Sequence, residues 1–190
     1  MIKERILSAF LELSRIKGFY RVTMDELAAE AGLSKRTLYR YFHSKDEIIE
    51  AALDKFMAGM AVKIEELVAV QRTPDEMVKY ILDAFYQGGQ IISNPLVLDD
   101  LRQHYPRYWK RIDDFRVAKV QNIIRVCLND RNKAYTRELD PRIVTTAVLA
   151  AIRAVVNPEF IITNGLTFEE TVRQLLEFLQ YGFMKRAETR

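Results

Sequence analysis

The sequence predicts an all-α protein of about nine helices, with a three-helix domain at the N-terminus and a larger helical domain after it. Repeated capping signals mark the helix starts, and the apolar residues between them recur at helical spacing. No segment keeps the period-two alternation of a strand. Seven glycines and five prolines among 190 residues are too few for the many turns of an all-β fold.

Helix starts are marked by Ser or Thr followed three residues later by Glu. In this capping box the hydroxyl accepts from the third backbone N–H, and the Glu carboxylate reaches back to the N–H of the cap. The four pairs are Thr23/Glu26, Ser44/Glu47, Thr73/Glu76 and Thr167/Glu170. Proline also follows a cap residue at three starts, where its missing N–H costs nothing. These are Thr73-Pro74, Asn94-Pro95 and Asp140-Pro141.

The helical spacing between these signals gives the expected elements. They are residues 2–17, 24–31, 35–42, 45–70, 74–92, 95–103, 106–128, 141–156 and 168–186. We expect one domain at residues 1–47 and a second at residues 48–190. Because the boundary falls inside the helix that begins at Lys45, the two domains share a helix rather than a flexible linker.

Composition favours a soluble globular protein, since 49% of the residues are apolar and 29% are charged. A single cysteine excludes an intrachain disulfide framework and a cysteine metal cluster, and we expect no metal and no cofactor. No run approaches 18 uncharged apolar residues, and the charged segment Met1–Arg5 differs from a signal peptide. We therefore expect a cytoplasmic protein with no membrane partner.

Residues 23–42 have the pattern of a helix-turn-helix, in which two short helices are joined through a glycine. Thr23 caps the first helix, and Gly32 supplies the left-handed conformation of a tight turn. Ser34 caps the second helix, and Leu38 lies on its inward face. In such a motif the second helix enters the major groove of DNA with its N-terminal residues first.

The second helix carries a local basic patch on a chain whose net charge is only +3. From Leu33 to Lys45 there are four basic residues and no acidic one. Their donors, together with two tyrosine hydroxyls, suit phosphates and base edges, which indicates a localised anionic partner. The same pattern also suits a solvated face of a helical bundle that never contacts DNA, with Tyr39 and Tyr41 as packing residues.

The run Gly32-Leu33-Ser34-Lys35-Arg36-Thr37-Leu38-Tyr39-Arg40-Tyr41-Phe42, followed by Ser44-Lys45-Asp46-Glu47, closely resembles the signature of the TetR family of bacterial transcriptional regulators. Thr23 and Leu27-Ala28 match as well. The similarity covers about residues 1–50, and beyond them only the helical layout and the total length resemble the family. The resemblance implies an N-terminal DNA-binding domain and a C-terminal helical domain for ligand binding and dimerisation.

The resemblance also implies roles for individual residues. Thr23 and Lys45 would hold phosphates, and Tyr39 and Tyr41 would contact the backbone or a base. Arg36 is the first candidate for a guanine contact. The predicted DNA-binding residues are Thr23, Ser34, Lys35, Arg36, Thr37, Tyr39, Arg40, Tyr41 and Lys45.

Two apolar helices of the second domain are expected to form a homodimer interface. Between Ile143 and Val156 the only charge is Arg153, and four alanines allow close helix approach. Two such helices per subunit would form a four-helix interface, unless both are buried within one monomer. The predicted interface residues are Val144, Val148, Ile152, Val155, Val172, Leu175, Leu176, Leu179 and Phe183.

Aromatic residues and methionines gather in the middle helices, where they could line an apolar cavity or form ordinary core. The predicted cavity residues are Phe56, Met60, Phe85, Tyr86, Tyr105, Tyr108, Trp109 and Phe115. Such a cavity would take a small apolar or aromatic effector.

The sequence therefore predicts a repressor that an effector releases from a near-palindromic operator. Its partners would be double-stranded operator DNA, a second copy of the chain and the effector. The alternative is a helical sensor or scaffold that no longer binds DNA, which a gel shift with genomic fragments would distinguish. An enzyme is disfavoured, because the sequence shows no nucleophile–base pairing, no glycine-rich phosphate loop and no metal-ligand cluster, and we expect no catalytic residue.

Overall fold

The computed structural model confirms the all-α fold class and describes residues 1–70, 73–88, 94–128 and 139–183. These ranges contain ten helices and no strand. The helices are α1 Ile2–Lys17, α2 Met24–Glu30, α3 Lys35–Tyr39, α4 Lys45–Ala69, α5 Pro74–Gly88, α6 Pro95–His104, α7 Pro106–Cys127, α8 Pro141–Val155, α9 Pro158–Thr163 and α10 Phe168–Phe183.

The predicted helix starts are confirmed by their hydrogen bonds. Thr23 Oγ1 accepts from the Glu26 N–H at 3.3 Å, and the Glu26 carboxylate accepts from the Thr23 N–H at 3.0 Å. Ser44 also caps α4, accepting from the N–H of Glu47 at 3.2 Å. The Glu47 carboxylate differs from the expectation, because it accepts from the N–H of His43. Ser44 therefore caps without the reciprocal half of the box.

Two helices differ from the sequence prediction. The helix α3 ends at Tyr39 and not at Phe42, because the N–H groups of Arg40 and Tyr41 bond to carbonyls three residues back and tighten the last turn. The short helix α9 was not expected at all. Its start at Pro158 follows the cap Asn157, whose side chain accepts from the N–H of Phe160 at 2.9 Å.

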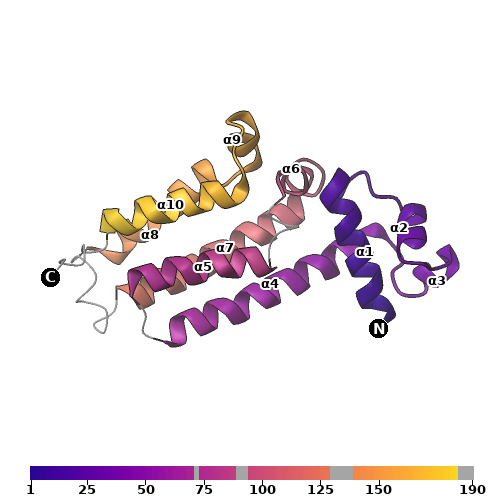
Figure 1. The fold of residues 1–190 in the computed structure, drawn as a ribbon, viewed down its shortest axis with the longest axis horizontal. Helices are drawn as coiled ribbons and strands as arrows, with labels where there is room; N and C mark the ends of the chain where they lie inside the picture. Colours follow the sequence, from indigo (N-terminus) through magenta and orange to yellow (C-terminus); the bar gives the residue numbers. More distant parts are fainter. Residues whose placement is uncertain (71–72, 89–93, 129–138, 184–190) are drawn as a thin grey trace.

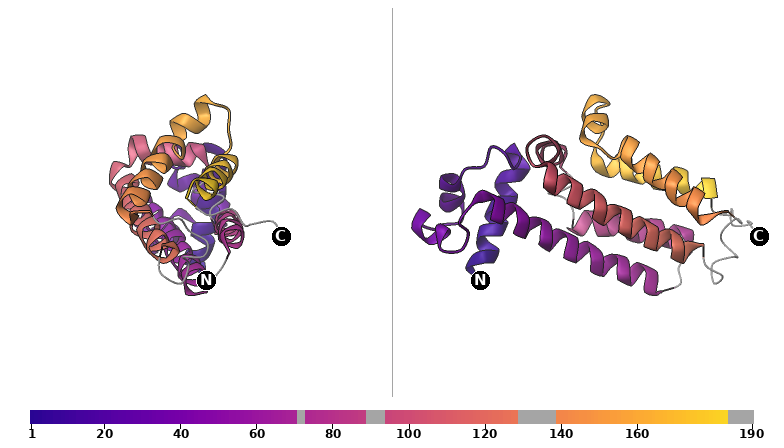
Figure 2. Two further views of the ribbon diagram at one scale, coloured as in Figure 1. Left: turned by 90° about the vertical axis from the view of Figure 1, so that its left-hand side faces the viewer. Right: turned by 180° about the vertical axis from the view of Figure 1, so that it is seen from behind.

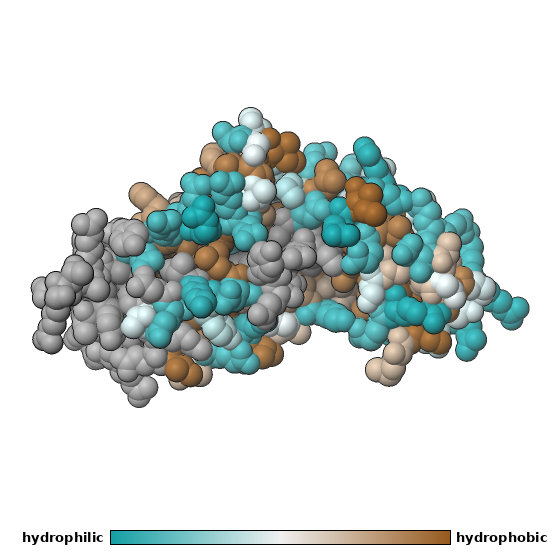
Figure 3. Space-filling view, viewed as in Figure 1, coloured by the Kyte–Doolittle hydropathy of each residue, from teal (hydrophilic) through white to brown (hydrophobic). Residues whose placement is uncertain are grey.

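The first three helices and the first turn of α4, residues 1–47, form a compact group at one end of an elongated molecule (Figure 1). We call this group the head. The rings of Phe10 and Phe19 lie 4.9 Å apart in its core, where Leu27 and Leu38 are also fully buried. On the face shown in Figure 3, the surface of the head is mostly hydrophilic.

The helices from residue 48 onward form the body, in which five helices make a closed ring. The helix α4 packs against α5, α5 against α10, α10 against α8, α8 against α7, and α7 against α4. The left view of Figure 2 looks along these helices. The short helix α6 packs against both α1 of the head and α7 of the body. The helix α6 therefore lies between the head and the ring of body helices.

Within the described ranges, every helix is too short or too polar to traverse a lipid bilayer. The same ranges hold no group of three or more histidine, cysteine or acidic side chains that could bind a metal ion.

Candidate functional site

The turn between α2 and α3 depends on Gly32, which has a φ of 60°. Only glycine adopts this left-handed conformation without a steric cost. The N–H of Leu33 bonds to the carbonyl of Ala28 at 2.8 Å and closes the end of α2. Ser34 then starts α3 by accepting from the N–H of Thr37 at 3.1 Å. The predicted helix-turn-helix is therefore present, with α3 as its second helix.

The outward face of α3 carries cationic and aromatic side chains. Leu38 is fully buried against the head, whereas Arg36 and Arg40 are exposed and Tyr39 is 39% exposed. In the part of the chain that the structure describes, neither arginine has an ion-pair partner. Both guanidinium groups are thus available to an anionic ligand outside the chain.

The other tyrosine and the threonine of α3 are less accessible. Tyr41 is half-buried and packs against the core of the head. Thr37 is half-buried, and its hydroxyl lies 2.9 Å from that of Ser34. These residues support the shape of α3, and only part of each side chain is available for contact.

Lys35 forms an ion pair across the helix-turn-helix. Its ammonium lies 2.7 Å from a carboxylate oxygen of Asp25 on α2. The hydrogen bond to Asp25 raises the pKa of Lys35 above its usual value. Because both groups are exposed, the pair contributes little to stability. Lys35 can therefore exchange Asp25 for a phosphate at small cost.

The side chain of Lys45, at the start of α4, points toward the turn before α2. Its ammonium donates to the carbonyls of Tyr20 at 2.7 Å and Val22 at 3.2 Å, and it lies 5.5 Å from the centre of the Tyr20 ring. Partial burial lowers the pKa of Lys45. An ammonium has three donors, so one remains after these two bonds. Lys45 thus holds the turn before α2 in place.

Thr23 holds the start of α2 together with two charged residues. Lys17 lies 2.5 Å from the carboxylate of Glu26, which also accepts from Thr23. The hydrogen bond from Lys17, followed by those from Thr23, lowers the pKa of Glu26 to about 2. The hydroxyl of Thr23 is therefore committed to the capping box, although the side chain is exposed.

One basic residue beside this turn was not predicted. Arg21 is exposed and, among the described residues, has no ion-pair partner. It lies between Tyr20 and Val22, whose carbonyls bind Lys45. The signal in the sequence was a basic residue two positions before the Thr23 cap.

The helix α6 joins the head to the body through the turn after α1. Asp100 accepts from the N–H of Tyr20 at 2.9 Å, and the rings of Tyr20 and His104 stack at 3.8 Å. The side chain of Asn94 donates to the carbonyl of Arg15 at 2.8 Å. The close approach requires Gly18, whose φ is 79° and whose Cβ, if present, would lie 2.1 Å from Asp100 Oδ2.

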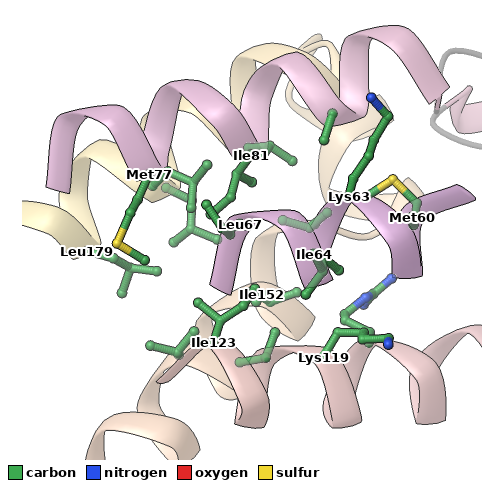
Figure 4. A pocket seen from close by; sticks show the side chains of 18 of the residues that line it. Met60, Lys63, Ile64, Leu67, Met77, Ile81, Lys119, Ile123, Ile152 and Leu179 are labelled. Carbon is green, nitrogen blue, oxygen red and sulfur yellow. The ribbon is translucent and has the colours of Figure 1, made fainter. Parts of the chain in front are cut away.

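The ring of body helices encloses a cavity of about 240 Å³. Apolar side chains of α4, α5, α7, α8 and α10 form most of its wall, and Leu98 of α6 also lines it. Among the described lining residues, three are basic, Lys63, Arg116 and Lys119, and none is acidic. Figure 4 shows Lys63 and Lys119 toward the same end of the cavity, with Met77 and Leu179 toward the other.

The structure separates the predicted cavity residues into three groups. Phe56, Met60 and Phe115 line the cavity. Tyr105, Tyr108 and Trp109 lie instead at the junction of α6 and α7, where they pack against the core of the head. The Tyr108 hydroxyl, for example, donates to the backbone carbonyl of Asp46 at 3.0 Å. The side chains of Phe85 and Tyr86 lie outside the described part of the structure.

Cys127 also lines the cavity, beside Met77 at 3.9 Å between the two sulfur atoms. Burial raises the pKa of its thiol to about 12, so the thiol is protonated and unreactive at neutral pH.

Most of the predicted interface residues face the inside of the subunit. Val144, Val148 and Val172 are buried, and Ile152, Leu175, Leu176 and Leu179 line the cavity. Val155 is half-buried, and the side chain of Phe183 lies outside the described part. The reason is that α7 and α5 cover the apolar stripes of α8 and α10 within the ring. The outward side of these two helices carries different apolar residues, with Ile143 70% and Phe178 71% exposed.

Comparison with known proteins gives the same picture for the head and for the whole fold. The family model of the bacterial regulatory proteins of the tetR family matches residues 6–52. The chain is 30% identical over 182 residues to the HTH-type transcriptional regulator YvaF of Bacillus subtilis strain 168, and 94% of each chain is covered.

Solved structures at lower identity share the fold. A transcriptional regulator from Saccharomonospora viridis, solved with choline, superimposes with a TM-score of 0.74 at 18% identity, covering 97% of this chain and 98% of that chain. The regulator FadR of Bacillus subtilis, solved with stearoyl-CoA, superimposes with a TM-score of 0.67 at 17% identity, covering 94% and 98%. Taken with the exposed cations of α3, the match to YvaF over nearly the whole chain shows that this protein is a helix-turn-helix transcriptional regulator of the TetR family.

Proposed function

We propose that the protein is a repressor that binds a near-palindromic operator as a homodimer and is released by a small molecule bound in the cavity of the body. Residues 1–47 act as the DNA-binding domain, and residues 48–190 act as the ligand-binding and dimerisation domain. The observation that carries DNA binding is the outward face of α3. Arg36, Tyr39 and Arg40 are exposed there, whereas Leu38 is buried against the head.

In this proposal each residue of the head has a distinct task. Arg36, in the first turn of α3, donates to a guanine edge, which two guanidinium N–H groups fit well. Lys35 and Arg40 neutralise phosphates on either side. Lys45 offers its third donor to a phosphate while its other two hold the turn before α2. Thr23, Ser34, Thr37 and Tyr41 maintain the shape of the motif and approach the backbone with their exposed atoms.

The second copy docks on the outward side of α8 and α10. Ala147, Ala150 and Ala154 are exposed on α8 and let another helix approach closely. Ile143 and Phe178 supply the large apolar side chains that a buried interface needs. A twofold axis through this face makes it self-complementary, and it places two α3 helices about 34–36 Å apart on one side of DNA.

The helix α6 carries the state of the cavity to the head. Leu98 lines the cavity, while Asp100, two residues later, holds the turn at Tyr20. A ligand that moves α6 therefore shifts α1 and α2 relative to the dimer axis. Release follows if the ligand binds better to the arrangement in which the two α3 helices no longer match one DNA turn.

Ligand binding in a body of this fold has support from the two structural neighbours, one solved with stearoyl-CoA and the other with choline. These two ligands carry opposite charges, so they do not indicate which class of ligand this chain binds. The class of ligand that this chain binds depends on the side chains that line its own cavity.

Selection of bound duplexes from a random DNA library tests the proposal. We expect an enriched motif with two inverted half-sites whose centres lie about one helical turn apart. Enrichment of a single asymmetric half-site would contradict the dimer, and no enrichment at all would leave the helical sensor without DNA binding as the better account. A matched selection with Ile143→Asp, which places a charge on the outward face of α8, should lose the inverted repeat.

A further inference from the structure

The wall of the cavity combines many apolar side chains with a few basic ones, and this combination indicates a class of ligand. Most of the wall is hydrocarbon, contributed by leucine, isoleucine and valine of α4, α5, α6, α7, α8 and α10. Its charged members are Lys63 on α4 and Arg116 and Lys119 on α7, two helices that pack against each other. The cavity is therefore apolar along most of its length and cationic at one end, as Figure 4 shows for Lys63 and Lys119.

Cations beside an apolar cavity are unfavourable without a counter-charge. Arg116 is the most deeply placed, with only 19% of its side chain exposed, and this burial lowers the pKa of its guanidinium. Its ion-pair partner, Asp113, lies 3.8 Å away and is held more closely by Arg153 at 2.9 Å. One carboxylate thus faces two arginines, which leaves positive charge at this end.

The apolar end suits a flexible chain. Met60 and Met77 both line the cavity, and the unbranched thioether side chain of methionine adapts to ligands of different shape. The volume of about 240 Å³ lies just below the range of about 300–1,000 Å³ that is usual for ligand pockets. A single medium-length chain fits this space, and a large polycyclic or nucleotide ligand does not.

We propose that the cavity binds an amphipathic carboxylate, with its hydrocarbon chain between α5, α7 and α10 and its carboxylate held by Arg116 and Lys119, which lie three residues apart on one face of α7. Lys63 of α4 adds positive charge on the other side of the same end. This inference rests on the proposed function, because it names the ligand class of the same cavity. It narrows the expectation of an apolar or aromatic effector to one with an anionic head. A cationic amphiphile is rejected by the same three side chains, since like charges oppose its entry.

Calorimetric titration of the full chain with three amphiphiles of equal length tests the charge requirement. The probes are dodecanoate, dodecanol and dodecyltrimethylammonium, each below its micelle concentration. We expect dodecanoate to bind at least about tenfold more tightly than dodecanol, as a charge-assisted hydrogen bond would provide, and the cation to bind weakest. Equal affinity for dodecanoate and dodecanol would overturn the proposal, because the cavity would then recognise only hydrocarbon.

Matched variants locate the carboxylate. Arg116→Met and Lys119→Met should each weaken dodecanoate binding about tenfold while leaving dodecanol binding unchanged, and the retained dodecanol binding shows that the cavity has formed. Lys55→Met on α4 and Lys110→Met on α7 are the controls, since both residues are exposed and neither lines the cavity. Wild-type affinity for dodecanoate in both Arg116→Met and Lys119→Met would overturn the assignment.

These outcomes separate the ligand class from the regulatory role. If an operator is selected but dodecanoate has no advantage over dodecanol, the ligand class is wrong and the repressor proposal stands. If dodecanoate binds as expected but does not displace the operator, the ligand class stands and release by this ligand is wrong.

Discussion

The head and the body of this molecule are packed in different ways. In the head, Phe10, Phe19, Leu27 and Leu38 are fully buried in a core that continues into the adjoining parts of α4, α6 and α7. In the body, five helices surround a cavity of about 240 Å³. A close-packed core holds one arrangement, whereas helices around a cavity can be displaced by what fills it. In the proposed function, this difference assigns DNA recognition to the close-packed region and ligand sensing to the region that has space to change.

The largest expected effect compares two buried leucines, one in each region. Leu38 is fully buried in the head, and Leu67 is 1% exposed but borders the cavity. Leu38→Ala should lower the free energy of unfolding by about 2–5 kcal/mol. Leu67→Ala should lower it less, because a side chain beside empty space has fewer contacts to lose.

Urea unfolding of both variants checks this ordering, with the change read from the midpoint at an unchanged slope. Equal losses of unfolding free energy in the two variants would mean that the body is as tightly packed as the head, which would contradict the proposed difference between the regions.

A smaller effect is expected at the junction between the two regions. Gly18→Ala places a methyl group 2.1 Å from Asp100 Oδ2 at a backbone conformation that is essentially restricted to glycine. We expect a loss of about 1–3 kcal/mol in the free energy of unfolding. Gly59→Ala is the control, because Gly59 lies within α4 with nothing near its added Cβ. That control should stabilise the chain by about 0.5–1 kcal/mol, the usual gain of alanine over glycine in a helix.

A third effect concerns the charge that holds the head in place. Lys45→Ala should weaken binding to every DNA sequence and reduce the salt slope by about one, if one phosphate contact is lost. The melting temperature should fall as well, because the bonds to the carbonyls of Tyr20 and Val22 are removed. Anisotropy titrations of a labelled operator across a salt series measure the slope, with Lys110→Ala as the control. An unchanged slope accompanied by a lower melting temperature would assign Lys45 a purely structural role.

The smallest effect is a dependence of stability on acid. The pKa of Glu26 is lowered from 4.5 to about 2 by Lys17 and Thr23. A folded-state pKa below the unfolded one stabilises the fold above pH 4.5, and this contribution is lost as the pH falls toward 2. The urea midpoint of Glu26→Gln should therefore fall less steeply than that of the wild type between these values. If the urea midpoints of Glu26→Gln and the wild type fall in parallel, Glu26 contributes nothing to the loss of stability in acid.

The head could be predicted from the sequence in detail because its signals are local. Thr23, Gly32 and Ser34 each act on a neighbour within a few residues, and the structure confirms the cap, the positive φ and the second cap. The missed helix α9 had the same kind of signal in Asn157-Pro158, but its six residues leave no room for a visible apolar period. The direction of the Lys45 ammonium was not predictable, because it depends on a turn 25 residues earlier.

The body was predictable only as a set of helices. The sequence places Trp109 and Phe115 on one helix, yet Trp109 packs at the junction with the head and Phe115 faces the cavity. Which face of a helix borders a cavity depends on which helices surround it, and this ring depends on contacts such as α4 with α7 and α5 with α10, which are not consecutive in the sequence. For the same reason the sequence does not show that α5 and α8 pack against α10 within the subunit. Lys63, Arg116 and Lys119 gave no signal, because basic residues on a helix are normally solvated.

The most direct test of the central claim, that α3 reads DNA bases through its exposed arginine, compares two affinities. The operator obtained by selection and a scrambled duplex of equal length are titrated at one salt concentration with the wild type, Arg36→Ala and the control Arg125→Ala on α7. We predict that Arg36→Ala loses about 1–3 kcal/mol on the operator and much less on the scrambled duplex, while Arg125→Ala matches the wild type. Equal losses of Arg36→Ala on both duplexes would contradict the claim and reduce Arg36 to a phosphate contact.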